Sequence, residues 1–322
     1  MILARHAEAL FWAGRQLERA EATTRALDVV GRNSMHLREQ RAHAEWVAML
    51  GLFGAAAPPE ARGRAADRDE VIRRLFLDGE HQGSVKATVF QLRENFRTVR
   101  DRVPVELWEE ANRLHLELQR GDLARQLALT PFDLFTSVRR ACQAMAGVAA
   151  EAMPRDETYT FFDSGRMLER CIITCRLARV GLADAGSGFE PSVLLRCSSS
   201  LQAYRREFGY ADEPMRIATF LLCAGHTPRS VLSCLRRVDE RLEALQEYGP
   251  GLGPARQLCG RARSNLEFGD VVGSLENDAL TFLDDIESAL VGLSDVIAAY
   301  AFNPAHSPVL HAQFIRPGVD IS

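Results

Sequence analysis

The sequence predicts an all-α protein built from two homologous helical halves. Alanine, leucine, arginine and glutamate are abundant in its 322 residues, while aromatic residues make up only 7%, and this balance favours helices over sheets. Apolar residues recur at helical spacing, and no segment alternates apolar and polar residues for long. A charged helical segment near the N-terminus also occurs a second time, 151 positions later.

Helical periodicity and turn-forming residues together predict twelve helices. The breaks include loops at 54–64 and 183–191 and a Gly/Pro-rich turn at 248–254, and Pro104 stands in the first turn of a helix, where proline is tolerated. The predicted helices cover residues 4–31, 33–53, 69–78, 84–102, 105–120, 131–151, 157–182, 191–208, 213–223, 228–247, 254–266 and 273–299.

The doubled segment runs from Phe11 to Arg25 and from Phe162 to Arg176. Eight of its fifteen positions are identical without a gap, whereas unrelated segments would share about one. The stretch 72–85 also resembles 217–231, with one residue inserted in the second copy, and an amphipathic helix follows each stretch. Both similarities indicate a duplication.

The duplication divides the chain into two repeats, residues 1–152 and residues 153–322. The second repeat ends in an irregular tail over 303–322, which is a candidate docking segment. Duplicated units that pack on each other commonly form a pseudo-twofold arrangement, and two copies are too few for an open solenoid. We therefore expect a pseudo-twofold helical bundle.

Composition and charge exclude several classes of protein. The formal net charge of −4 gives no sign of a nucleic-acid binder. No uncharged stretch approaches the roughly 18 residues that span a bilayer, and Arg5 and Glu8 interrupt the first apolar run, unlike a signal peptide. The seven cysteines are odd in number and irregularly spaced, which argues against a disulfide framework. We expect a cytoplasmic protein that binds neither nucleic acid nor membrane.

The repeated segment places a glutamate on the apolar side of its helix. At about 100° per residue, Glu18 shares a stripe with Phe11, Gly14 and Leu17, and Gly14 allows another backbone to approach closely. Glu169 occupies the same place in the second copy. The arginines on the flanks of these glutamates and one to two turns beyond them are Arg15, Arg19, Arg25, Arg166, Arg170 and Arg176.

A carboxylate on a buried stripe must be paired, or it takes up a proton. In one interpretation, Glu18 and Glu169 accept hydrogen bonds from arginines or helix N-termini across the interface and fix the register of the two halves. Arg15, three residues before Glu18, is close enough for a local pair. In the other interpretation, the glutamates belong to a polar pocket that binds a substrate amine or a basic group of a partner. We prefer the first, and the second stays open.

The two copies differ at positions that bear on function. Glu21 corresponds to Ile172, so only the first copy has two acidic residues one turn apart, with Arg25 four residues after Glu21. If one half retains a working site, it is the first. Glu18 and Glu21 are then the catalytic candidates, as a paired acid and base.

A second charged set follows the margin of one predicted helix and consists of Arg93, Arg97 and Arg100. Three guanidinium groups in a row can clamp carboxylates or phosphates. They can equally serve as internal partners of Glu18 and Glu21, or form a solvated face. We prefer internal or interface pairing.

No other motif indicates a reaction. Cys171 and Cys175 stand one turn apart, but no histidine or further cysteine lies at a ligand spacing, so we expect no metal. The sequence contains no phosphate loop, no nucleophile elbow and no zinc motif. No cofactor is expected, and nothing marks the chain as an enzyme by itself.

Taken together, these features resemble the Alpha-E family, a helical domain named for a Glu-Arg motif and usually found as a tandem duplication. The resemblance rests on MILARHAEALFWAGRQLERAEATTR at the N-terminus and on LRENFRTVRDRVPVELWEEAN farther along, and it covers nearly the whole chain. It assigns the motif to Glu18-Arg19 and Glu169-Arg170.

The resemblance also implies a setting. Members of the family accompany circularly permuted ATP-grasp ligases of the carboxylate–amine type, transglutaminase-like proteins and a proteasome-like peptidase, which implies a peptide synthesis or modification system. We therefore expect an accessory subunit that binds the ligase or its peptide substrate. The alternatives are an enzyme that acts on a peptide or amide by acid–base chemistry at the Glu-Arg motif, and a purely structural helical scaffold.

Overall fold

The chain is described by a computed structural model over residues 2–55, 67–182, 189–246 and 252–302. Within these ranges it forms fourteen α-helices and no strand, which confirms the predicted all-α class. The candidate docking tail and most of the three predicted loops lie outside the described residues. No helix in the described ranges has the length and apolar composition that crossing a bilayer requires.

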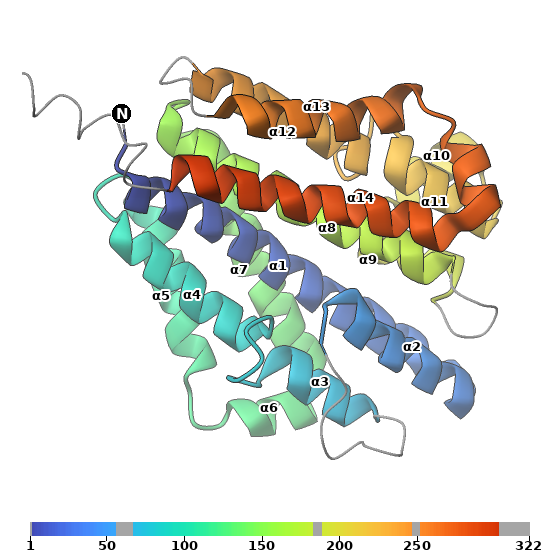
Figure 1. The fold of residues 1–322 in the computed structure, drawn as a ribbon. Helices are drawn as coiled ribbons and strands as arrows, with labels where there is room; N and C mark the ends of the chain where they lie inside the picture. The colour runs from blue at the N-terminus through green and yellow to red at the C-terminus, as the bar shows by residue number, and fades with distance from the viewer. Residues whose placement is uncertain (1, 56–66, 183–188, 247–251, 303–322) are drawn as a thin grey trace, which may run out of the picture.

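The helices fall into two sets along the chain (Figure 1). The first set is α1 (Ala4–Ser34), α2 (Glu39–Leu52), α3 (Arg68–Phe76), α4 (Val85–Thr98), α5 (Val105–Leu118), α6 (Leu123–Leu129) and α7 (Pro131–Ala152). The second set is α8 (Glu157–Gly181), α9 (Pro191–Cys197), α10 (Leu201–Phe208), α11 (Pro214–Cys223), α12 (Val231–Gln246), α13 (Gly253–Phe268) and α14 (Val271–Ala301).

The prediction of twelve helices was wrong in two places. Helix α6 has only seven residues, too few for a helical period to show in the sequence. The helix expected over 191–208 is two helices, because Ser199 between them has φ +58°, a left-handed conformation that ends a helix. A further departure lies within α14, where Asp278 leaves the helical conformation and its side chain accepts a hydrogen bond from the Thr281 amide at 3.1 Å.

Helices α1 and α8 lie side by side through the centre of the molecule (Figure 1). Helix α1 packs against α4 and α7, with α5 outside them, and α8 packs against α12 and α14, with α13 outside them. The two sets of four helices therefore make corresponding contacts. That correspondence is what a duplication would produce, while the boundary at residue 152 and a twofold relation between complete halves stay predictions.

Glycines set the distance between the two central helices. A Cβ atom on Gly14 would lie 2.0 Å from the Phe162 carbonyl oxygen, and one on Gly165 would lie 2.0 Å from the Phe11 carbonyl oxygen. Any side chain at either position would therefore collide with the opposite backbone. The close approach predicted for Gly14 is confirmed, and the same contact occurs in the second copy.

Glu45 of α2 is a buried acid away from the central pair. The Asn33 amide nitrogen donates to its two carboxylate oxygens at 3.2 and 3.1 Å, and the Glu190 backbone amide donates at 3.4 Å. Burial raises the pKa of the Glu45 carboxyl in spite of these hydrogen bonds. The pKa of Glu45 is therefore higher in the folded state than its value of about 4.5 in the unfolded chain, so the folded state holds the proton more tightly. The resulting stabilisation is complete below about pH 4.5 and is lost as the pH rises through the folded pKa.

Replacing Glu45 by glutamine is expected to remove this pH-dependent cost. The free energy of unfolding of the variant, relative to the wild-type protein, should increase between pH 5 and pH 8 by on the order of 1 kcal/mol. Urea unfolding at the two pH values measures the difference. Glu39→Gln, an exposed change on the same helix, is the control and should show no such trend. A flat difference for Glu45→Gln would contradict the prediction.

Candidate functional site

The glutamate of the first repeated segment is held by arginines of the second. Arg170 forms a bidentate pair with Glu18, with Nε 2.7 Å from Oε1 and Nη2 2.7 Å from Oε2. Arg166 adds a longer contact, with Nη2 3.6 Å from Oε2. Parallel guanidinium–carboxylate bonds of this kind fix geometry as well as charge.

The reverse arrangement holds the second glutamate. Arg15 reaches Glu169 with Nε 2.8 Å and Nη2 2.7 Å from Oε2, and Arg19 lies with Nη2 2.6 Å from Oε1. Arg15 and Arg19 correspond in the repeat to Arg166 and Arg170. Each glutamate thus takes the two arginines of the opposite copy. We call the six residues Arg15, Glu18, Arg19, Arg166, Glu169 and Arg170 the Glu–Arg clasp.

Both carboxylates of the clasp are buried and charged. Glu18 is 3% exposed and Glu169 is 0% exposed. Burial alone would raise their pKa values, but Arg170 and Arg229 hold the pKa of Glu18 far below its usual range. Arg19 and Arg15 likewise lower the pKa of Glu169. A carboxylate whose oxygens face arginines, and which stays ionised at neutral pH, is a poor general acid and an unreactive base.

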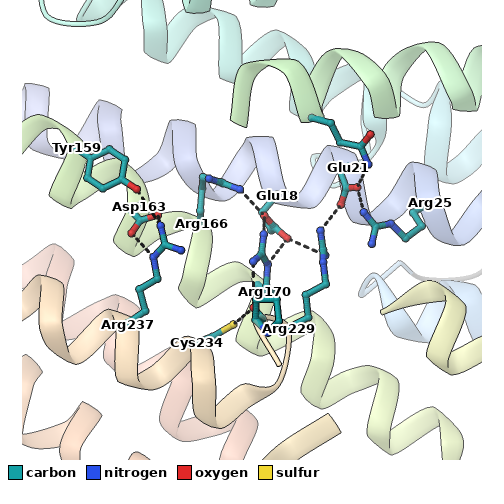
Figure 2. A network of polar contacts seen from close by, with 12 residues as sticks. Glu18, Glu21, Arg25, Tyr159, Asp163, Arg166, Arg170, Arg229, Cys234 and Arg237 are labelled. Carbon is teal, nitrogen blue, oxygen red and sulfur yellow. Dashed lines mark hydrogen bonds and ion pairs between the residues drawn. The ribbon is translucent and has the colours of Figure 1, made fainter. Parts of the chain in front are cut away.

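The clasp continues into a longer row of charges (Figure 2). Arg229 lies between the two acids of the first copy, with Nη1 3.3 Å from Glu18 Oε1 and Nη2 3.5 Å from Glu21 Oε2. Glu21 also pairs with the buried Arg25, one turn along α1, and Gln143 of α7 donates to Glu21 at 3.4 Å. Glu21 is therefore also paired with arginines, one of them on its own helix.

Glu21, the additional acid of the first copy, contacts Arg229, which lies in the turn that carries the inserted residue of the second copy. Ile172 stands where the first copy has Glu21, so the second copy needs no additional cation there. The residue inserted in the second copy falls in the turn 226–230, which contains Arg229, and the corresponding turn 81–84 has no arginine. The two departures from the repeat are thus coupled in space, and neither creates an unpaired acid.

A second buried acid with arginine partners lies nearer the start of α8 than the clasp does, and the sequence did not single it out as a site. Asp163, which corresponds to Trp12, is fully buried and accepts bonds from Arg237 at 2.7 and 2.8 Å and from Arg241 at 2.9 Å. The Tyr159 hydroxyl accepts from Arg237 at 2.9 Å (Figure 2). The substitution of tryptophan by aspartate in the repeat, and two arginines four residues apart on α12, were the signals for this pair.

The row formed by Arg93 and Arg97 of α4 and by Arg100, which follows that helix, contacts α4 and α5. Arg93 donates to Asn112 at 3.2 Å, Arg97 lies 2.5 Å from Glu94, and the guanidinium carbons of Arg93 and Arg100 lie 5.2 and 5.4 Å from the centre of the Trp108 ring. The preferred expectation of internal pairing agrees with these contacts within the chain, but the alternative that the three arginines are partners of Glu18 and Glu21 was wrong. The buried apolar face of α4 packs toward α1, which directs the arginines away from that helix.

Two further expectations are also corrected or refined. Arg15 does not pair with Glu18 three residues later, because its guanidinium group crosses to Glu169 and Ser294. Arg176, the counterpart of Arg25, binds Glu287 of α14 with distances of 2.7 and 2.8 Å. Among the described residues, no group of three or more histidine, cysteine or acidic side chains is arranged to hold a metal ion.

A comparison with known protein families identifies the family of the chain. The Alpha-E family, described as a predicted alpha-helical domain with a conserved ER motif, matches residues 2–302. The chain belongs to the Alpha-E family. The two Glu-Arg dipeptides to which the resemblance assigns that motif, Glu18-Arg19 and Glu169-Arg170, pair between the two copies and not within one copy.

Relatives in mycobacteria are longer proteins. The chain is 26% identical over 319 residues to an uncharacterized protein of Mycobacterium bovis (Mb2597) and to two of Mycobacterium tuberculosis (MT2643 and Rv2567). The match covers 90% of this chain but 36% of each relative. The chain thus spans just over a third of the length of these relatives. No solved structure is significantly similar to it.

Proposed function

We propose that the protein is a non-catalytic binding component of a peptide synthesis or modification system, in which it contacts an ATP-grasp amide ligase or the peptide substrate of that ligase. The observation that carries this proposal is that arginines already bind both glutamates of the Glu–Arg clasp. Glu18 and Glu169 are buried, ionised and bound by arginines, so the motif that names the family positions helices. Binding then belongs to the outer surface.

The length of the relatives supports a role in a larger assembly. In the mycobacterial proteins the matching region is covalently joined to additional chain that makes up most of their length. A domain that works beside another protein is often found fused to further chain in this way. The chain here would reach its partner through a surface contact. The unpaired cysteines are consistent with the cytoplasmic setting that the proposal assumes.

The acid–base alternative receives less support from the geometry. An enzyme of this type needs a carboxyl group within hydrogen-bond reach of a bound substrate. Glu18 and Glu21 are each at most 5% exposed, and arginines contact both. A substrate would have to displace a buried arginine to reach either group, and burying an unpaired guanidinium group is costly.

Association with the ligase tests the proposal. The full chain and a circularly permuted ATP-grasp ligase of the carboxylate–amine type should be purified separately, mixed at low micromolar concentration, and separated by size exclusion, with and without Mg-ATP and peptide substrate. We expect co-elution under at least one of these conditions, and no co-elution with an unrelated ATP-grasp ligase. Separate elution under every condition would overturn the proposal.

A further inference from the structure

The second set of helices contains a cavity of about 510 Å³. It lies between α10, α11 and the first turns of α14, which Figure 1 shows together at one end. Phe208, Met215, Phe220 and Cys223 supply apolar lining. The two phenylalanine rings meet edge to face, with centroids 6.0 Å apart. Its volume is in the range of sites that take one or two side chains or a small ligand.

Carboxylates stand at the mouth of this cavity. Glu207 is 3.2 Å from His226, and Glu213 is 2.9 Å from Arg216, so two of the three acids already have a partner. Glu276 is exposed and has no hydrogen bond or ion pair with any described residue. It belongs to α14, which has six acidic residues and no lysine or arginine over Val271–Ala301. The mouth therefore carries an unbalanced negative charge.

Large apolar side chains are exposed around the same end. Tyr210, which follows α10, is 81% exposed, and Phe268, the last residue of α13, is 80% exposed. These are the largest exposed fractions among the large hydrophobic residues in the described part of the chain. Val272 and Leu280 of α14 are also exposed, at 45% and 48%. Val272 also lines the cavity, and exposed apolar residues beside a cavity are typical of interaction surfaces.

We propose that this cavity and its apolar margin form the docking site for a basic segment of a partner protein. An apolar side chain of the segment enters the cavity over Phe208 and Phe220, and a neighbouring lysine or arginine pairs with Glu276. Charge complementarity selects this occupant, because the mouth offers a free carboxylate. The inference rests on the proposed function, since it names the surface through which the chain would hold its partner.

Matched capped dipeptides test the chemistry directly. N-acetyl-Phe-Lys-amide, its neutral counterpart N-acetyl-Phe-norleucine-amide and the acidic N-acetyl-Phe-Glu-amide should be titrated into the full chain and followed by saturation-transfer NMR. We expect the basic peptide to bind about two- to fivefold more tightly than the neutral one, as for an exposed ion pair. The acidic peptide should bind most weakly, and added salt should reduce the differences.

Two variants and one control locate the site. Glu276→Gln should abolish the preference for the basic peptide, whereas Asp285→Asn, an exposed change of the same charge on the same helix, should leave it intact. Thr219→Trp places bulk in the cavity and should weaken all three peptides. Cys223 is the one cysteine of seven that is not buried, so bound peptide should also slow its alkylation by N-ethylmaleimide.

The outcomes separate this inference from the proposed function. Equal affinity for the three peptides, no saturable binding of the basic one, or an unchanged preference in Glu276→Gln overturns the docking site. If the ATP-grasp protein binds wild type, Glu276→Gln and Thr219→Trp equally well, the proposed function stands and the docking site fails. If that protein never binds but the peptides follow the expected order and the variants behave as described, the docking site stands and the proposed function fails.

Discussion

Replacing Glu18 by glutamine is expected to lower the free energy of unfolding by about 3 kcal/mol or more. The change keeps the size of the side chain but removes the charge that Arg170 and Arg229 share. Arg170, whose side chain is 11% exposed, then lacks an acidic partner, and Arg229 keeps only its contact with Glu21. A buried cation that loses its partner is strongly destabilising. Urea unfolding followed by circular dichroism at pH 7 measures the effect.

An exposed acid on the same helix provides the control. Glu8 is on α1 and exposed, so Glu8→Gln should change stability by no more than about 0.5 kcal/mol. If Glu18→Gln is as stable as Glu8→Gln, the clasp contributes little and the glutamate is free for another task. That result would favour the acid–base enzyme, for which Glu18 is needed in turnover but not in folding.

The ion pairs of Glu18 also determine how the stability of the protein changes as the pH falls. The pKa of Glu18 is lowered in the folded protein, mainly by Arg170 and Arg229 against the effect of burial, relative to about 4.5 in the unfolded chain. The unfolded state then binds the proton more readily, so the stabilisation is complete above about pH 5 and is lost as pH falls through the folded value. Acid unfolding of Glu18→Gln should therefore be less steep than that of the wild-type protein.

The inward position of Glu18 could be predicted because it depends on one helix alone. The helical period places it with Phe11 and Leu17, and both of these are buried in the structure. Gly14 indicated a close backbone contact for the same reason, since a missing side chain on an apolar stripe has a local meaning. About fifteen residues of sequence are enough to show which side of a helix a residue faces.

The partners of Glu18 could not be predicted from one helix. Arg15 is near enough in sequence for a local pair, but the crossing of α1 and α8 at the glycines brings Arg170 closer. The register of the two helices decides which residues meet, and the register follows from tertiary packing. The repeat did contain a hint, because identical spacing in both copies allows each glutamate to use the arginines of the other.

Long-range partners were missed for a related reason. Arg229 lies in the turn before α12 and Arg237 lies on α12, and nothing near them in the sequence indicates their partners on α1 and α8. The row at Arg93, Arg97 and Arg100 looked more suitable because it is regular. Its regularity reflects the margin of α4 beside α5, where Trp108 and Asn112 take two of the three guanidinium groups.

The contacts of the Glu–Arg clasp indicate that its charged residues hold the two central helices together in this protein. A motif of two charged residues attracts attention as a catalytic site, but here both of its glutamates are occupied by arginines inside the protein. Buried ion pairs of this kind contribute more to a specific geometry than to net stability. The clasp therefore specifies how the two central helices meet, and the proposed function assigns binding to the outer surface.

Gly14→Ala is expected to destabilise the protein by roughly 3 kcal/mol, at the upper end of the range for overpacking a core. The added methyl group would lie 2.0 Å from the Phe162 carbonyl oxygen and 2.9 Å from the Arg166 amide nitrogen. These are backbone atoms inside a helix, so they cannot rotate aside. Helices α1 and α8 must separate, and the clasp distances must lengthen with them. Thermal and urea unfolding measure the loss.

The helical glycine at 147 separates this packing effect from helix propensity. Gly147 lies on the exposed side of α7, and a methyl group there would meet no atom within 4 Å. Gly147→Ala should therefore raise stability by about 0.5–1 kcal/mol, the usual gain of alanine over glycine in a helix. The same substitution thus has opposite signs at the two positions. A stabilising Gly14→Ala would mean that the central helices do not cross at these glycines, and the reciprocal pairing of the glutamates would lose its geometric basis.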